Sequence, residues 1–119
     1  MTGGCEWLVD AFGCPAARLK DVAGLLRMSS SIIERLELNV LGEPLVHQFP
    51  EPGGVTALYL LTESHLAWHT YPESGLLTLN VYCCRPRAPI DWAALLGPAL
   101  GATRVSVHRV ERGGEVHGK

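Results

Sequence analysis

The segment 76–84 alternates between apolar and polar residues, and this pattern constrains the fold more than any other feature of the chain. Its odd-numbered residues are apolar and its even-numbered residues are mostly polar. Because residues two apart in a strand point to the same face, the pattern predicts a strand with one buried and one polar face. Adjacent Cys83 and Cys84 then point to opposite faces, with Cys83 in the core and Cys84 on the polar face.

Periodicity and turn residues predict the remaining elements. Between 16 and 38 the apolar residues recur at helical spacing, although three serines at 29–31 leave open whether this is one helix or two. Asp91 can cap a second helix over 92–100. The expected order is β-α-β-β-β-β-α-β in an α+β fold, a two-layer sandwich in which two helices pack on one face of an antiparallel sheet. The expected strands are 7–12, 44–49, 55–62, 65–70, 76–84 and 103–110.

Length and charge limit the functional classes. A chain of 119 residues fits a single domain over 1–119. The net charge of −2 offers no basic field for nucleic acid, and no apolar run is long enough for a membrane span. The N-terminus has no signal-peptide pattern, so we expect a cytoplasmic protein with free thiols. The spacing of the four cysteines matches no zinc pattern.

Reactive side chains gather in the stretch 61–73, between two apolar segments where a small protein normally buries plain hydrophobic residues. Ser64 follows Glu63, two histidines stand at 65 and 69, and Glu73 follows a Tyr-Pro turn. Taken singly, each residue has an ordinary structural explanation. Ser64 lacks a hydrolase Gly-x-Ser-x-Gly elbow. His65 and His69 are about 13 Å apart on a strand, too far to share a metal, so no metal site is predicted.

The motifs together resemble one known family. The blocks Glu63-Ser64-His65-Leu66 and His69-Thr70-Tyr71-Pro72-Glu73 closely resemble the self-processing segment of the prokaryotic S-adenosylmethionine decarboxylase proenzymes. The resemblance covers nearly the whole chain, and it also includes the segments 8–14, 47–49, 81–84, 104–105 and 111–113.

The resemblance implies a chain that makes its own cofactor. Ser64 would attack the Glu63 carbonyl, and the chain would separate into a β chain, 1–63, and an α chain, 64–119, that begins with a pyruvoyl group derived from Ser64. That group would form a Schiff base with the substrate amine and act as an electron sink. By similarity, His69 assists processing, Cys84 protonates the carbanion after carbon dioxide leaves, Phe49 stacks on the substrate, and Glu73 binds the ribose hydroxyls.

Three departures leave the substrate open. The family commonly has an acid where Asn80 stands, its usual N-terminal Gly-x-His is absent, and Cys83-Cys84 is doubled where one cysteine is usual. The resemblance implies S-adenosylmethionine decarboxylation for spermidine biosynthesis, and the departures leave L-ornithine or L-arginine as alternative substrates. A non-catalytic paralogue that binds an active partner is a further alternative. A homodimer of processed α/β units is expected, because ligand pockets favour interfaces and the strand over 55–62 is apolar on both faces.

Overall fold

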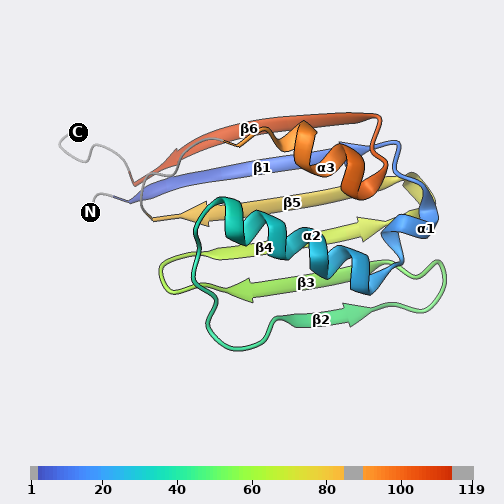
Figure 1. The fold of residues 1–119 in the computed structure, drawn as a ribbon, viewed down its shortest axis with the longest axis horizontal. Helices are drawn as coiled ribbons and strands as arrows, with labels where there is room; N and C mark the ends of the chain where they lie inside the picture. Colours follow the sequence, from blue (N-terminus) through green and yellow to red (C-terminus); the bar gives the residue numbers. More distant parts are fainter. Residues whose placement is uncertain (1–2, 85–89, 114–119) are drawn as a thin grey trace.

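A six-stranded antiparallel sheet with helices on one face forms the structure, a computed structural model that describes residues 3–84 and 90–113 (Figure 1). This architecture confirms the α+β fold class. The described residues form the elements β1 (Gly4–Phe12), α1 (Ala16–Leu19), α2 (Val22–Arg35), β2 (Leu45–Gln48), β3 (Val55–Leu60), β4 (His65–Tyr71), the 3₁₀ helix η1 (Pro72–Ser74), β5 (Leu76–Cys83), α3 (Trp92–Leu100) and β6 (Arg104–Arg112).

The strands lie in the order β2-β3-β4-β5-β1-β6, so that β1 is inserted between β5 and β6. Consecutive strands β2 to β5 form a meander, and β1 pairs with β5 from Cys5 opposite Cys83 to Ala11 opposite Leu77. The strand predicted over 103–110 extends to Arg112, because it pairs with the full length of β1. The segment 85–89, between the strand predicted over 76–84 and the helix predicted over 92–100, lies outside the described residues.

The predicted helical region 16–38 forms two helices, and the break falls at Lys20–Asp21 instead of at the serines. Asp21 is the N-cap of α2, and its Oδ1 accepts a hydrogen bond of 3.1 Å from the Gly24 amide. Ser29 lies inside α2, and its hydroxyl donates to the Leu25 carbonyl at 3.0 Å. A side chain that caps a new helix therefore outweighs a local run of poor helix formers.

Helix α3 begins at the predicted cap, where Asp91 Oδ1 accepts from the Ala94 amide at 3.0 Å. It continues past Pro98 and ends at Gly101, which has a φ of 67°. A simple helical pattern places Ala99 on the buried side of α3. In the structure Ala99 is exposed, and Leu100 is buried.

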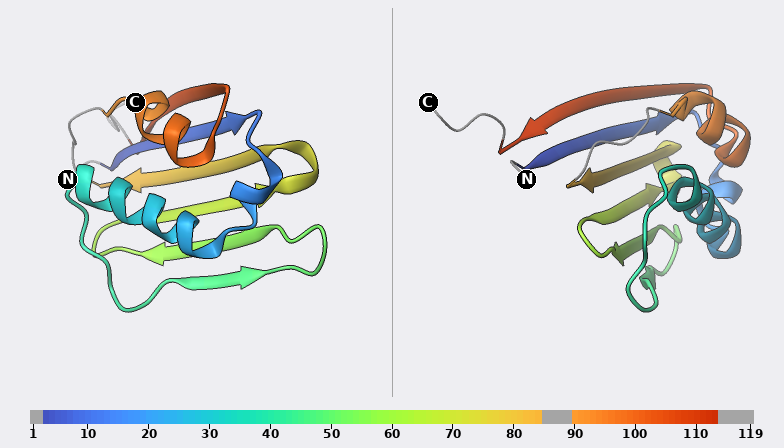
Figure 2. Two further views of the ribbon diagram at one scale, coloured as in Figure 1. Left: turned by 45° about the vertical axis from the view of Figure 1, so that its right-hand side comes forward. Right: turned by 60° about the vertical axis from the view of Figure 1, so that its left-hand side comes forward.

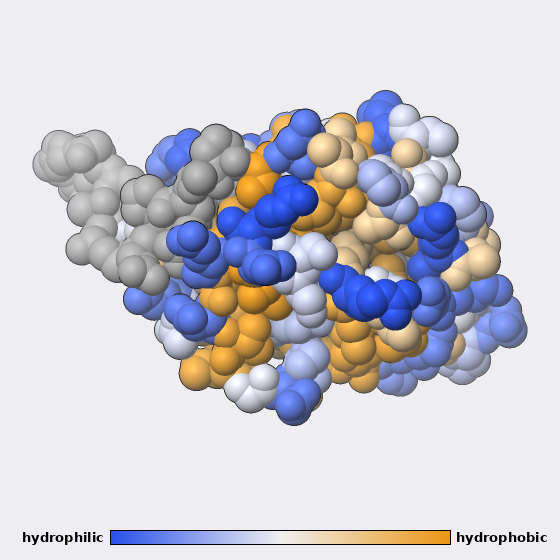
Figure 3. Space-filling view, in the orientation of Figure 1, coloured by the Kyte–Doolittle hydropathy of each residue, from blue (hydrophilic) through white to orange (hydrophobic). Residues whose placement is uncertain are grey.

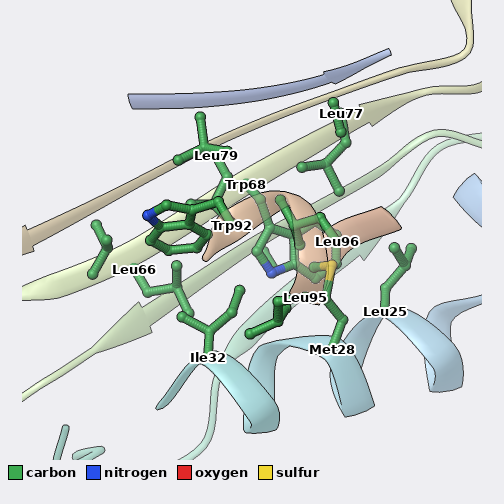
Figure 4. Close-up of a cluster of buried hydrophobic side chains, with 14 of the residues drawn as sticks. Leu25, Met28, Ile32, Leu66, Trp68, Leu77, Leu79, Trp92, Leu95 and Leu96 are labelled. Carbon is green, nitrogen blue, oxygen red and sulfur yellow. The ribbon is translucent and has the colours of Figure 1, made fainter. Parts of the chain in front are cut away.

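The core lies between these helices and the sheet. Leu25, Met28 and Ile32 project from one side of α2 toward Trp68 of β4, and Leu96 of α3 completes the contact (Figure 4). The opposite side of α2 faces solvent, and hydrophilic residues lie over this helix in the space-filling view (Figure 3). Burial of the apolar stripe thus fixes both helices on the same face of the sheet.

Buried polar contacts cross this core. The Trp68 indole Nε1 donates a hydrogen bond of 2.7 Å to Ser29 Oγ, and both side chains are fully buried. A second buried hydroxyl, that of Thr70, accepts from the Val55 amide at 2.9 Å and donates to the Leu19 carbonyl at 2.7 Å. These bonds tie α1 and α2 to the strands that carry the reactive residues.

The other face of the sheet, which we call the open face, carries no helix among the described residues (Figure 2). Large apolar side chains are exposed there, including Leu45 at 71% and Leu60 at 59%. Strand register and alternation place the following residues on the open face: Glu6, Leu8, Asp10, Leu45, His47, Thr56, Leu58, Leu60, His65, Ala67, His69, Thr78, Asn80 and Tyr82.

We expect Ser29→Ala to lower the free energy of unfolding by about 1–3 kcal/mol, because the buried Trp68 Nε1 loses its acceptor. Urea unfolding monitored by tryptophan fluorescence measures the change. Ser30→Ala is the matched control, since Ser30 lies on the exposed side of the same helix. Equal stability of the two variants would contradict the importance of this hydrogen bond.

Candidate active site

The short turn between β3 and β4 holds Glu63 and Ser64. The Leu61 amide donates to the Ser64 carbonyl at 3.0 Å, which closes the turn. Glu63 is exposed and Ser64 is half-buried, so the peptide bond between them is accessible from the end of the sheet. A tight turn of this kind fixes the direction of the Glu63 carbonyl with little freedom of the main chain.

Cys84 lies directly against this turn. Its thiol donates a hydrogen bond to the Glu63 carbonyl oxygen, from the strand end that follows β5. The neighbouring Cys83 is fully buried while Cys84 is half-buried, as the alternation predicted. Because the acceptor is the carbonyl of the Glu63–Ser64 peptide, the thiol can stabilise negative charge that develops on that oxygen.

Gly4 permits this close arrangement. A Cβ atom at this position would lie 1.9 Å from the Cys83 carbonyl oxygen and 2.8 Å from the Cys84 Cα atom. Any larger residue would therefore push the start of β1 away from the end of β5 and would displace Cys84.

A polar cluster on the open face adjoins the turn. The Asn80 amide nitrogen lies 2.8 Å from Glu6 Oε2 and 3.4 Å from His65 Nε2. Glu6 Oε1 accepts from the Arg112 guanidinium at 2.7 Å. The His65 ring also lies beside the Tyr82 ring, with centroids 5.9 Å apart. We refer to Glu6, His65, Asn80, Tyr82 and Arg112 as the β1–β5 cluster.

His69 lies elsewhere on the same face. Its Nδ1 is 2.8 Å from the hydroxyl of Thr56, its direct neighbour on β3. The register continues this line of polar residues through Thr78 on β5 to Asp10 on β1. A hydroxyl partner on Nδ1 fixes the orientation of the imidazole and leaves Nε2 as the outward ring nitrogen.

The structure separates the predicted site residues into two groups. His69 is five residues beyond Ser64 along the sequence, which corresponds to about 16 Å on an extended strand. Phe49 and Glu73 follow β2 and β4 at the same end of the sheet, opposite the end that holds Ser64 (Figure 1). We call these the Ser64 end and the His69 end. Within one protomer the predicted residues do not form a single site.

Phe49 is available for ring contacts at the His69 end. It is 52% exposed, and its ring meets the His47 ring edge-on with centroids 4.5 Å apart. His47 is in turn the direct strand neighbour of Thr56. The aromatic surface and the His69 imidazole therefore belong to one continuous area of the open face.

Sequence reasoning missed three residues at these ends. Thr56 contacts His69, and Glu6 and Arg112 belong to the β1–β5 cluster. The signal for Thr56 was its position in an otherwise apolar strand. Arg112 lies in the matching segment 111–113 but had no assigned role, and no local pattern singled out Glu6, because their contact depends on β1 being inserted between β5 and β6.

Other potential site chemistry is limited in the part of the chain that the structure describes. Burial raises the pKa of the Cys14 thiol, which makes it a poorer nucleophile at neutral pH. Among residues 3–84 and 90–113, no group of three or more His, Cys, Asp and Glu side chains is arranged to hold a metal ion. The described helices are all too short or too polar to cross a membrane.

Comparison with known proteins gives a consistent result. The sequence profile of the S-adenosylmethionine decarboxylase family matches residues 5–113. An S-adenosylmethionine decarboxylase proenzyme of Prochlorococcus marinus (strain MIT 9313) is 34% identical over 110 residues, which are 92% of this chain and 86% of that protein. The proenzyme of Picrophilus torridus is 31% identical over 114 residues, covering 95% of this chain and 86% of that protein.

A solved structure agrees with the sequence matches. The crystal structure of the adenosylmethionine decarboxylase from Aquifex aeolicus superimposes with a TM-score of 0.77 at 27% identity, and covers 99% of this chain and 96% of that one. The match spans both ends of the sheet described above. The chain belongs to the S-adenosylmethionine decarboxylase family.

Proposed function

We propose that the protein is a self-processing, pyruvoyl-dependent S-adenosylmethionine decarboxylase whose product supplies aminopropyl groups for spermidine biosynthesis. The observation that carries this proposal is the contact between the Cys84 thiol and the carbonyl oxygen of Glu63, the residue before Ser64. A nucleophile, an electrophilic carbonyl and a hydrogen-bond donor to its oxygen are the components that an acyl shift needs.

In the proposed cleavage, Ser64 Oγ attacks the Glu63 carbonyl carbon and its proton is removed by a base. The Cys84 thiol stabilises the negative charge on the carbonyl oxygen by donating a hydrogen bond to it. Collapse of this intermediate breaks the peptide C–N bond, protonates the nitrogen and leaves an ester. Removal of the Ser64 α-proton then expels the Glu63 carboxylate, and water releases ammonia from the new N-terminus. The products are the chains 1–63 and 64–119, the second with a terminal pyruvoyl group.

The pyruvoyl group supplies a carbonyl that withdraws electrons from the bound substrate. Its position fits the residues present, because Ser64 lies in the turn that Cys84 contacts. Cys84 is suited to deliver a proton to the substrate carbon after decarboxylation, since its half-buried thiol is beside the new N-terminus. Phe49 offers a ring face to adenine and the sulfonium cation, and the Glu73 carboxylate can accept hydrogen bonds from ribose hydroxyls.

We further propose a homodimer that joins the two ends into one site. His69 is about 16 Å from Ser64 along its own strand, so the His69 that assists cleavage must come from a second protomer. A two-fold axis that reverses the strand direction puts the Ser64 end of one open face against the His69 end of its partner. The exposed apolar side chains of Leu45, Leu58 and Leu60 support such a contact.

The first test is self-cleavage. We expect the purified wild-type chain to separate between Glu63 and Ser64, and Ser64→Ala to remain one chain of 12.9 kDa, because it lacks the attacking hydroxyl. Intact-mass spectrometry measures both results. Ser74→Ala is a control, since that serine is exposed at the end of η1. An uncleaved wild-type chain would favour the non-catalytic paralogue instead.

The second test concerns the substrate. We expect carbon dioxide release from carboxyl-labelled S-adenosylmethionine and none from L-ornithine or L-arginine, because Phe49 provides a surface suited to a nucleoside. Ser64→Ala should reduce release to the background rate. Release from either amino acid, with none from S-adenosylmethionine, would assign the same chemistry to that amino acid.

The third test concerns shared sites. Alone, Ser64→Ala should not cleave, and His69→Ala should cleave much more slowly than the wild type. After the two are unfolded together and refolded, about half of the dimers are mixed, and each mixed dimer has one complete pair of Ser64 and His69. We expect cleavage of the His69→Ala chains only, which distinct affinity tags reveal on a gel. An uncleaved mixture of well-folded mixed dimers would rule out sharing.

A further inference from the structure

The β1–β5 cluster has a fixed hydrogen-bond direction. The Glu6 carboxylate is paired with Arg112 and is therefore ionised, so both of its oxygens can only accept hydrogen bonds. The Asn80 atom that lies 2.8 Å from Glu6 Oε2 must then be its NH₂ group. The Glu6 side chain is only 17% exposed, so water competes weakly for this contact.

Asn80 also sets the hydrogen-bond direction at His65. The same Asn80 nitrogen faces His65 Nε2 at 3.4 Å with its second hydrogen. That ring nitrogen must accept, so it carries no proton, and the neutral ring holds its proton on Nδ1. Because Nδ1 is bonded to the ring carbon nearest the main chain, the donor of His65 lies on the side of its own peptide, directly after Ser64.

The surrounding charges agree with a neutral ring. Arg112 already neutralises Glu6, so a protonated His65 would add a second cation to the cluster. The Arg112 guanidinium also lies 5.6 Å from the Tyr82 ring, which stands between Glu6 and His65 in the strand register. The ionisable groups near His65 are Glu6 from β1, Arg112 from β6, Tyr82 and Cys84 from β5 and its end, and Glu63 from the turn.

We propose that His65 is a further functional residue at the Ser64 end, and that Glu6 and Asn80 are positioning residues that keep it neutral with its proton on Nδ1. This inference rests on the proposed self-cleavage at Ser64. The cluster also gives a role to Asn80, the position where the family resemblance led us to expect an acid. The carboxylate of the cluster stands on β1, and an amide stands between it and His65.

A paired exchange separates this role from simple strand cohesion. In Glu6→Gln/Asn80→Asp, an amide and a carboxylate still face each other between β1 and β5, but the carboxylate now lies beside His65 Nε2. A carboxylate there can only accept, so Nε2 must carry a proton, and the imidazolium is favoured. The variant thus keeps the contact between strands and reverses its direction toward His65.

We expect ¹⁵N ring spectra of the uncleaved Ser64→Ala protein to show His65 with the proton on Nδ1. Adding Glu6→Gln/Asn80→Asp should move the proton to Nε2 or protonate both nitrogens. The His65→Gln spectrum assigns the signals. This readout does not depend on cleavage, so it remains valid if the proposed function fails.

In chains with Ser64 intact, Glu6→Gln/Asn80→Asp places a carboxylate beside His65 Nε2 and changes the hydrogen-bond direction at the ring that we propose acts at the Ser64 end. Cleavage of the double variant should therefore be about tenfold slower than that of the wild type at neutral pH. Glu111→Gln is the matched control, because it removes the carboxylate of another β6 Arg–Glu pair on the opposite face.

The outcomes are distinct. An unchanged His65 tautomer, or a wild-type cleavage rate in a double variant of normal stability, would overturn the inference while leaving self-cleavage intact. A wild-type chain that never cleaves would overturn the proposed function, and the tautomer spectra would then decide the hydrogen-bond direction alone. If the double variant does not fold, Asn80→Leu replaces it. That variant removes both hydrogen bonds, and it should abolish the single Nδ1–H signal in favour of a tautomer mixture.

Discussion

The described helices all pack on one face of the sheet, and the distribution of chemistry in the molecule depends on this one-sided covering. Strand alternation then sends each second residue either into a dry core or onto the open face. On β5, this separates buried Cys83 from half-buried Cys84. On β4, Leu66 and Trp68 hold the helices, while His65 and His69 stand outside the core. The reactive residues of the central stretch are therefore displayed by strands whose other side is fixed by packing.

Much of the fold was predictable because β5 alternates along its length and Asp91 marks the start of α3. Asp91 and the strand over 76–84 were both placed correctly from local sequence. The break before Asp21 was missed because three consecutive serines are a stronger local signal than one aspartate. Only the structure shows that the hydroxyl of Ser29 serves Trp68, a residue 39 positions away.

The candidate site was predictable in its parts and not in its arrangement. The resemblance drew attention to Ser64, His69, Cys84, Phe49 and Glu73, but it could not give their distances. Extended strands separate residues that are close in sequence, as they separate Ser64 from His69. They also join residues that are far apart, since Glu6 and Asn80 differ by 74 positions and meet through the pairing of β1 with β5.

The separation of Ser64 from His69 within one chain supports the proposed homodimer. The domain exposes Leu45, Leu58 and Leu60 on one face. Covering these side chains would lower the free energy by roughly 25 cal/mol for each Å² of apolar surface removed from water. A second copy of the same face, as in the proposed homodimer, would meet that need, and its symmetry would form every contact twice. The line from His47 through Thr56 to His69 would then lie against a partner's turn, where Cys84 holds the Glu63 carbonyl. The apolar residues would supply the affinity, while the polar line and the β1–β5 cluster, one at each end, would supply the chemistry.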